Sequence, residues 1–147
     1  IFGWLLFRDR LNTKVNLHHK TIADNSCCLR CDHHLEDAAH LALTCPRAVQ
    51  VWRLLDFHSP SNIDLLWDIV TPDGLDINIW PTVALAILWK LWDSHNAQVF
   101  CSETHSAQDT MRNVISDLTL WVLRFKDHVS REAAMSWRLY LSSHYNL

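Results

Sequence analysis

The chain has 147 residues, of which 49% are hydrophobic and 20% charged, and its formal net charge is −3 at pH 7. This length and apolar content suit one domain, or one domain with a small metal-held subdomain, and they exclude an intrinsically disordered chain. Two glycines and four prolines argue against a turn-rich all-β fold, and the acidic balance is not that of a dedicated nucleic-acid-binding protein.

The distribution of charge and the number of cysteines indicate where phosphate could bind and in which compartment the protein acts. Residues 1–53 carry seven basic and five acidic side chains, whereas residues 54–147 carry six basic and eleven acidic ones. Any contact with phosphate is therefore expected in the first third of the chain. Five cysteines is an odd number, which fits reduced thiols inside the cell better than the disulfide framework of a secreted protein. The sequence starts at Ile1 rather than Met and shows no secretory signal, so we expect a fragment of a longer intracellular protein.

The first 20 residues predict two short helices. The first helix is expected to end near Asn12, because four apolar residues fall at helical spacings: Trp4, Leu5, Phe7 and Leu11. Thr13 can cap a second helical turn through Leu17. The polar residues 18–20 (His-His-Lys) are interpreted as a solvated helix end, with a backbone phosphate contact as the alternative.

The most informative motif is C-x2-C-x8-H-x4-C, formed by Cys28, Cys31, His40 and Cys45. Two cysteines separated by two residues can bind one ion from a tight turn, and a histidine and a third cysteine supply the other corners of a tetrahedron. Four protein ligands leave no open coordination position for water. The motif therefore predicts one structural zinc ion.

Neighbouring residues offer alternative ligands. Cys27 with Cys31 would give a three-residue spacing, and His33 and His34 follow Cys31 closely. We favour Cys28 because the two-residue spacing is the usual geometry of such turns. An apolar cluster of cysteines or a disulfide is the alternative without metal.

Glu36 and Asp37 are expected to open the helix that carries His40, where acidic side chains complement the helix dipole. The Asp37 carboxylate could bind the free imidazole nitrogen of His40 or simply cap the helix, and the sequence leaves both roles open. Pro46 fits the first turn of the next helix, whose apolar stripe is Ala48, Val51, Trp52 and Leu55.

Residues 61–76 predict a connecting region with one short helix, capped by Ser61 or Asn62. The apolar face of this helix is expected to comprise Ile63, Leu66, Trp67 and Val70. Pro81 then opens a buried helix, whose apolar run of residues 83–92 is too short to span a membrane.

Two further helices complete the prediction. Ser106 begins a capping-box-like start, and Ser130 is expected to cap the last helix. Their inward faces are predicted from three- and four-residue spacings: Met111, Val114, Ile115, Leu118, Val122 and Phe125, then Ala133, Ala134, Trp137 and Leu141. The eight tryptophans are interpreted as packing residues, and only for Trp4 is stacking on a nucleic-acid base an alternative.

These elements predict a mainly α fold in which a small zinc-stapled helical module (residues 1–60) is followed by a connecting region (61–76) and a helical bundle (77–147). The sequence lacks G-x4-G-K-[ST], G-x-G-x-x-G and G-x-S-x-G. The sequence also shows no pair of aspartates in a strand–turn context of the kind that a polymerase uses to hold two metal ions. We therefore expect no enzymatic activity and no small-molecule substrate.

The cysteine pair is followed by further residues that carry a family resemblance: Glu36, His40-Leu41, Cys45-Pro46 and Val51-Trp52. This pattern resembles the zinc-binding domain that follows the reverse transcriptase of plant-type non-LTR (LINE-like) retroelements. Residues 4–6 and 8–13 are similar to the start of that domain. Residues 88–100 resemble its later helix, L-W-x-x-W-x-x-R-N-x-x-V-F, with one departure: His95 stands where the family usually carries Arg.

The resemblance implies an intracellular accessory module, with the nucleus as a candidate compartment. This module would hold zinc and help a reverse transcriptase to bind template RNA or target DNA. Its partner would be the polymerase domain of a parent RNA-directed DNA polymerase. By charge, the nucleic-acid contacts are expected to be Arg8, Arg10, Lys14, Lys20 and Arg30. The alternatives are a protein-interaction module and a non-functional retroelement-derived fragment.

Overall fold

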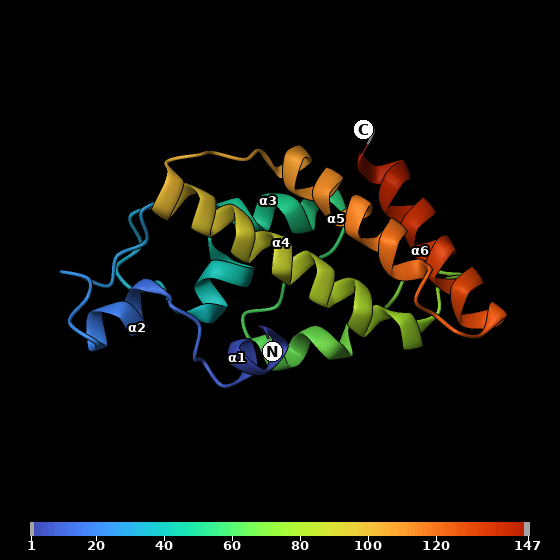
Figure 1. The fold of residues 1–147 in the computed structure, drawn as a ribbon, viewed down its shortest axis with the longest axis horizontal. Helices are drawn as coiled ribbons and strands as arrows, with labels where there is room; N and C mark the ends of the chain where they lie inside the picture. The colour runs from blue at the N-terminus through green and yellow to red at the C-terminus, as the bar shows by residue number, and fades with distance from the viewer. Residues whose placement is uncertain (1, 146–147) are drawn as a thin grey trace.

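The computed structural model describes residues 2–145 as a helical fold with no strand among them (Figure 1). Its α-helices are α1 (Phe2–Phe7), α2 (Lys14–His19), α3 (Pro46–Leu54), α4 (Trp80–Cys101), α5 (Ala107–Val122) and α6 (His128–Tyr145). Three short helical segments complete the described part: the π-helical η1 (His40–Thr44) and the 3₁₀-helical η2 (Ile63–Asp68) and η3 (Ile77–Ile79). The predicted mainly α fold is confirmed.

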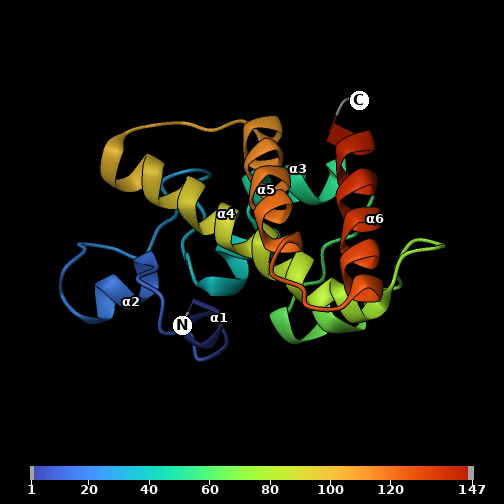
Figure 2. The same cartoon turned by 45° about the vertical axis from the view of Figure 1, so that its right-hand side comes forward.

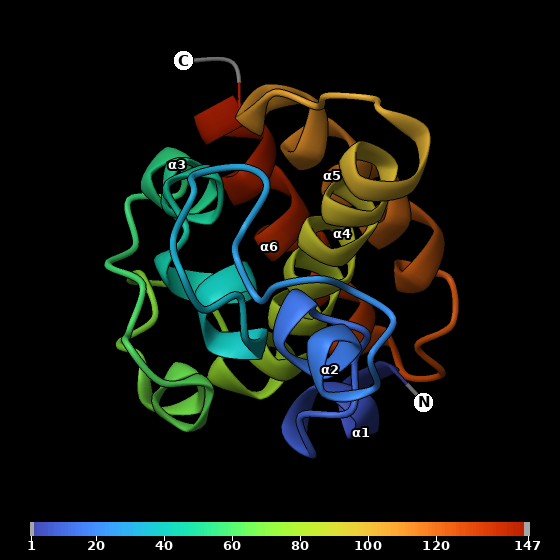
Figure 3. The same ribbon diagram turned by 90° about the vertical axis from the view of Figure 1, so that its left-hand side faces the viewer.

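Helix α4 is the central element (Figures 1 and 3). It contacts α5 as well as η1, η2 and η3, and its middle is buried at most positions: Val83, Ala84, Ala86, Ile87, Leu88 and Leu91. Helices α5 and α6 lie side by side in opposite directions (Figure 2), and α5 also packs against α3. Among residues 2–145, no helix combines the length and the apolar character that a membrane span needs.

The first segment of the chain packs onto α4 through α1. Phe2 and Trp89 meet edge to face with ring centroids 5.0 Å apart. A Cβ atom added to Gly3 would lie 3.3 Å from Cδ2 of Leu85, so the lack of a side chain at Gly3 lets α1 approach α4 closely. One cluster of buried apolar side chains accordingly extends from Leu6 to the last helix. The predicted division of the chain into a zinc-stapled module (residues 1–60), a connecting region (61–76) and a helical bundle (77–147) remains a prediction. It concerns which parts of the chain unfold separately.

Buried tryptophans tie the connecting segments to the core. Each donates its indole N–H to a backbone carbonyl: Trp52 to Ala42 at 2.9 Å, Trp80 to Leu66 at 2.9 Å and Trp137 to Asp76 at 2.8 Å. A buried indole N–H needs such a partner, so these bonds satisfy the ring and fix the connecting segment at once. Trp4 differs from them, because 60% of its surface is exposed.

Several predicted helix starts are confirmed. The Thr13 hydroxyl accepts a hydrogen bond from the backbone N–H of Asn16, and Ser106 forms a complete capping box with Asp109. Asn62 caps η2, and Ser61 does not, since the Asn62 side chain accepts from the N–H of Asp64 at 2.9 Å. These caps are local, so their partners lie within three residues.

The predicted end of the first helix is wrong. Helix α1 ends at Phe7, and Asp9 takes a left-handed conformation with φ of 51°. The backbone N–H of Arg10 then donates to the Leu5 carbonyl at 2.8 Å, which closes the helix. Because the chain turns here, the residues that become buried are Leu6 and Leu11. Trp4 and Phe7, two of the residues whose spacing predicted the helix, are exposed.

Two further expectations are also wrong. The last helix begins at His128, where the Asp127 carboxylate accepts the backbone N–H of Ser130 at 2.8 Å. Asp127 is therefore the capping residue, and Ser130 lies inside the first turn. Val70 is 92% exposed, because η2 ends at Asp68 and the chain beyond it is extended.

Candidate metal centre

The turn of residues 28–33, which we call the knuckle, positions the first two cysteines. The N–H of Cys28 donates to the His33 carbonyl at 2.8 Å, and the N–H of Asp32 donates to the Cys28 carbonyl at 2.9 Å. Asp32 has a φ of 62°, a conformation that Asp tolerates better than most residues. The N–H of Arg30 donates to Sγ of Cys28 at 3.4 Å. The backbone therefore directs a donor at the ligand sulfur, as is common around metal-bound thiolates.

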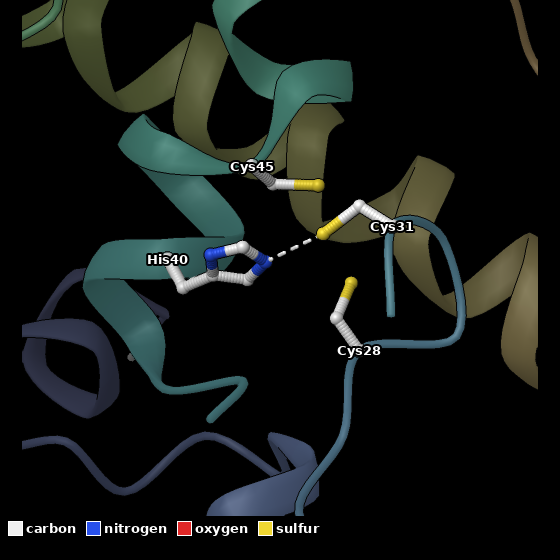
Figure 4. Close-up of side chains that lie close together, drawn as sticks. All are labelled: Cys28, Cys31, His40 and Cys45. Carbon is white, nitrogen blue, oxygen red and sulfur yellow. Dashed lines mark hydrogen bonds between the residues drawn. The ribbon is translucent and has the colours of Figure 1, made fainter. Parts of the chain in front are cut away.

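His40 and Cys45 occupy the two ends of η1. The N–H of Cys45 donates to the His40 carbonyl at 2.7 Å, a five-residue bond that defines the π-helical turn. Such turns are frequent at functional sites. Cys45 has extended backbone angles and Pro46 opens α3 directly after it. The turn thus brings both side chains to the side of the knuckle (Figure 4).

The four side chains point toward one another, and their ligand atoms all lie within 4.8 Å of each other (Figure 4). Sγ of Cys31 lies 3.3 Å from Nε2 of His40. In a tetrahedral zinc site the ligand atoms are about 3.5–3.8 Å apart, from bond lengths of about 2.0–2.3 Å. Cys28, His40 and Cys45 are buried and Cys31 is half-buried. The cluster fits one structural zinc ion.

The histidine is oriented by its other ring nitrogen. Nε2 of His40 faces the sulfurs, and Nδ1 lies 3.3 Å from the Thr44 hydroxyl. A metal-bound imidazole usually hydrogen-bonds through its second nitrogen, so Thr44 performs this role. The Asp37 carboxylate instead accepts the backbone N–H of His40 at 2.8 Å. Of the two roles open to Asp37, the structure shows helix capping.

The alternative ligands lie outside the four-residue cluster. The His33 ring stacks on the His40 ring with centroids 4.5 Å apart, and His34 stacks on His33. Both rings are exposed, and Nδ1 of His33 is hydrogen-bonded to the backbone of Leu35. Cys27 is half-buried and does not join the cluster.

The protonation states suit metal binding. A hydrogen bond from the Cys28 thiol lowers the pKa of Cys45 to about 7, although burial opposes the shift, and the same contact raises the pKa of Cys28. Cys45 is therefore the position where a thiolate forms first. Burial and the nearby His33 lower the pKa of His40, which favours the neutral imidazole that binds metals.

Glu36 lies beneath this site and was not foreseen as a buried residue. Its side chain is 0% exposed, and Oε1 accepts hydrogen bonds from Nε2 of His95 at 2.8 Å and from the N–H of Lys14 at 3.0 Å. Burial raises the pKa of Glu36, but the hydrogen bond and charge of His95 outweigh it and hold the pKa below its usual value. Glu36 was expected only to help open the helix that carries His40, and its burial and its pairing with His95 of α4 were not predicted.

The structure brings three of the five predicted basic contacts together. Arg8, Arg10 and Lys20 line one open pocket with Asn16, His19 and Asp9, and we call this the basic pocket. Lys14 and Arg30 do not line it. Lys14 is half-buried next to Glu36, and Arg30 lies in the knuckle.

Comparison with known families gives one result. Residues 1–52 match a family described as zinc-binding in reverse transcriptase, and this range contains all four residues of the cluster. Searches among curated proteins and among solved structures returned no match.

Proposed function

We propose that this chain, whose residues 1–52 are a zinc-binding domain of the reverse transcriptase type, holds one structural zinc ion and uses its basic pocket to bind the phosphate backbone of nucleic acid. The ligands would be Cys28, Cys31, His40 and Cys45. The matched family is a zinc-binding domain and not a polymerase domain. The role we propose is therefore accessory.

Zinc would supply folding free energy. Residues 20–37 contain no regular secondary structure, so few backbone hydrogen bonds hold them in place. Structural zinc in small peptides contributes on the order of 10–16 kcal/mol at neutral pH. With all four coordination positions filled by side chains, the ion would have no position for a reactive water. Its expected effect is to hold the knuckle against η1 and α3.

The basic pocket carries the nucleic-acid part of the proposal. Arg8, Arg10 and Lys20 come from two separate segments and meet beside His19, so four side chains that can donate hydrogen bonds share one opening. The side-chain amide of Asn16 already donates to the carbonyls of Asp9 and Leu11. Asp9 is the acidic residue in this pocket. Such groups bind phosphate oxygens without reading the base sequence. The acidic excess of residues 54–147 favours this end of the molecule.

The family match and the motifs at Cys45 and Trp52 support a wider context. We infer that the module belongs to a retroelement protein of the plant-type non-LTR kind and works beside its polymerase domain. Template RNA or target DNA would be the ligand, and target DNA would place the protein in the nucleus. The resemblance supports this context through residues 88–100 as well, outside the matched range.

The test is a binding titration of the zinc-loaded chain with single-stranded RNA, single-stranded DNA and duplex DNA at several salt concentrations. Three phosphate contacts predict a slope of log K against log salt of about −2 on single strands and about −3 on duplex. The variant Arg8→Gln/Arg10→Gln should make the slope shallower by about 1.4–1.8. The matched control is Arg124→Gln/Lys126→Gln, which changes two exposed basic side chains outside the module. This control should leave the slope unchanged.

Absence of binding by the zinc-loaded chain would contradict the nucleic-acid part and leave a protein-interaction module, or a retroelement-derived fragment without activity. An unchanged slope in the Arg8→Gln/Arg10→Gln variant would place the contacts elsewhere. Neither result bears on the zinc site, which metal analysis tests separately.

A further inference from the structure

Arg30 presents an unusual pair of donors. Within residues 2–145, its Nε and Nη2 atoms are buried and have no hydrogen-bond partner. These two nitrogens form one edge of the guanidinium, the edge that donates two parallel hydrogen bonds to an anion. A buried charged donor without an acceptor is strongly unfavourable. The fold therefore holds this edge where an anionic acceptor is needed.

The cysteine sulfurs of the knuckle are candidate acceptors for this edge. Arg30 stands between Cys28 and Cys31 in the knuckle, and its backbone N–H already donates to Sγ of Cys28. Oε1 of Glu36 is bonded to His95 and Lys14, and its Oε2 is buried without a hydrogen-bond partner, so no direct hydrogen bond joins Glu36 to this edge of Arg30 in the described part of the chain. The adjacent sulfurs become anionic when they bind a metal.

The negative charge of the zinc-bound cysteines would make them suitable acceptors for the Arg30 guanidinium. Three thiolates and one Zn²⁺ ion together carry a net charge of about −1. Cys28 and Cys45 are buried, with relative exposures of 2% and 0%, so solvent screens this charge poorly. A neighbouring guanidinium would both neutralise the centre and donate to its sulfurs.

We propose that the Nε–Nη2 edge of Arg30 donates hydrogen bonds to the cysteine sulfurs of the zinc-loaded centre and thereby holds the ion more tightly. This inference rests on the zinc site proposed above. Arg30 would then be a positioning residue of the metal centre, and the Nε–Nη2 edge of its guanidinium would not be available to nucleic acid.

The experiment measures zinc affinity of the full chain by competition with a chelator of known affinity at pH 7.4. Loss of groups that hydrogen-bond to metal ligands typically weakens metal binding 10–100-fold, so Arg30→Gln should lower zinc affinity by that factor and speed zinc release. Arg30→Lys keeps the charge without the two-pronged donor and should recover part of the loss. Arg124→Gln makes the same change at an exposed arginine outside the zinc-binding module and should bind zinc like the unaltered chain.

The absorption spectrum of the cobalt-substituted variants checks that a tetrahedral site with thiolate ligands still forms. With that spectrum retained in Arg30→Gln, a zinc affinity and release rate equal to those of the unaltered chain would overturn the role of Arg30 and leave the zinc site intact. Failure of the unaltered chain to bind zinc would overturn both proposals. A loss confined to Arg30→Gln, with recovery in Arg30→Lys, would support the proposal.

Discussion

Nε2 of His95 lies 2.8 Å from Oε1 of Glu36, and the two residues are 59 positions apart in the sequence. Both side chains are almost fully buried, at 1% and 0% exposure. The pair joins α4 to the segment between Cys31 and His40, two residues of the metal cluster. At the position where the resembling family usually carries Arg, this chain thus keeps a basic side chain in contact with a carboxylate.

Removing the basic partner of this pair should be strongly destabilising. His95→Leu would remove the side-chain donor to the buried Glu36 carboxylate, and breaking a buried pair in this way typically lowers the free energy of unfolding by about 3–5 kcal/mol. His95→Arg should retain more stability than His95→Leu because a guanidinium can donate to the same carboxylate. Urea unfolding of the zinc-loaded chain measures both.

The control for this prediction is a pair of the same chemistry on the surface. His128 and Glu132 lie 2.9 Å apart on α6 with both side chains mostly exposed, and exposed pairs contribute little. His128→Leu should therefore be close to neutral. A His95→Leu cost below about 1 kcal/mol would contradict the importance of the buried pair.

The hydroxyl of Tyr140 connects the last helix to the end of α3, because it donates to the buried Leu55 carbonyl at 2.9 Å. Tyr140→Phe should lower the free energy of unfolding by about 1 kcal/mol, the usual net value of such a bond. Tyr145→Phe removes a hydroxyl whose partner, Arg112, is exposed and should have a smaller effect. Thermal and urea unfolding give both values, and equal effects of the two changes would show that the Tyr140 bond adds nothing.

The ion pairs of Lys90 should make the free energy of unfolding depend on pH in the alkaline range. Its ammonium group lies 3.2 Å from both Asp93 on α4 and Asp117 on α5. Burial lowers the pKa of Lys90, but the two carboxylates outweigh burial and the pKa is raised overall. A raised lysine pKa gives stability that is complete below the unfolded value of about 10.4 and is lost as pH rises through the folded pKa.

Lys90→Met should therefore lower stability by about 1 kcal/mol near pH 7, and this difference from the unaltered chain should shrink above about pH 10.5. Lys126→Met, at an exposed lysine, is the matched control and should show no such trend. Urea unfolding at a series of pH values measures the difference. A difference that stays constant to the highest pH would mean that packing, and not charge, explains the effect of Lys90→Met.

Removal of the metal by a chelator should unfold residues 20–45 and leave helices α4–α6 folded. The apolar faces of α4–α6 bury surface without any ligand, each Å² contributing roughly 25 cal/mol, so these helices should keep amide protection after zinc removal. Residues 20–45 should lose theirs, and Cys31→Ser should have the same effect. Hydrogen exchange followed by residue is the measurement. Simultaneous loss of protection throughout the chain would mean that the shared core makes one cooperative unit.

What could be predicted from the sequence depends on the distance between partners. The caps at Thr13 and Ser106 were predictable because each bond joins residues three positions apart. The contact of Glu36 with His95 was not, because nothing local marks an acid for burial beside a residue 59 positions away. The same limit explains α1, where helical spacing is satisfied by Trp4 as well as by Leu6, and only packing against the core chooses between them.

The metal cluster shows the same division. Its four residues were predictable because ligand spacing is a local requirement of tetrahedral coordination. Thr44 was within reach of the sequence, since it lies four residues after His40, on the same face of a helix. Arg30 was expected among the phosphate contacts from its charge alone, and a buried guanidinium edge is visible only in the folded chain.

The most direct test of the zinc site is X-ray absorption at the zinc edge, combined with metal analysis of the purified chain. The site predicts one zinc per chain, bound by three sulfurs at about 2.3 Å and one nitrogen at about 2.0–2.1 Å. Serine at any one of Cys28, Cys31 or Cys45 should remove one sulfur from the shell or abolish binding. A chain that binds no zinc when zinc is supplied during expression, or a metal shell dominated by oxygen ligands, would contradict the account.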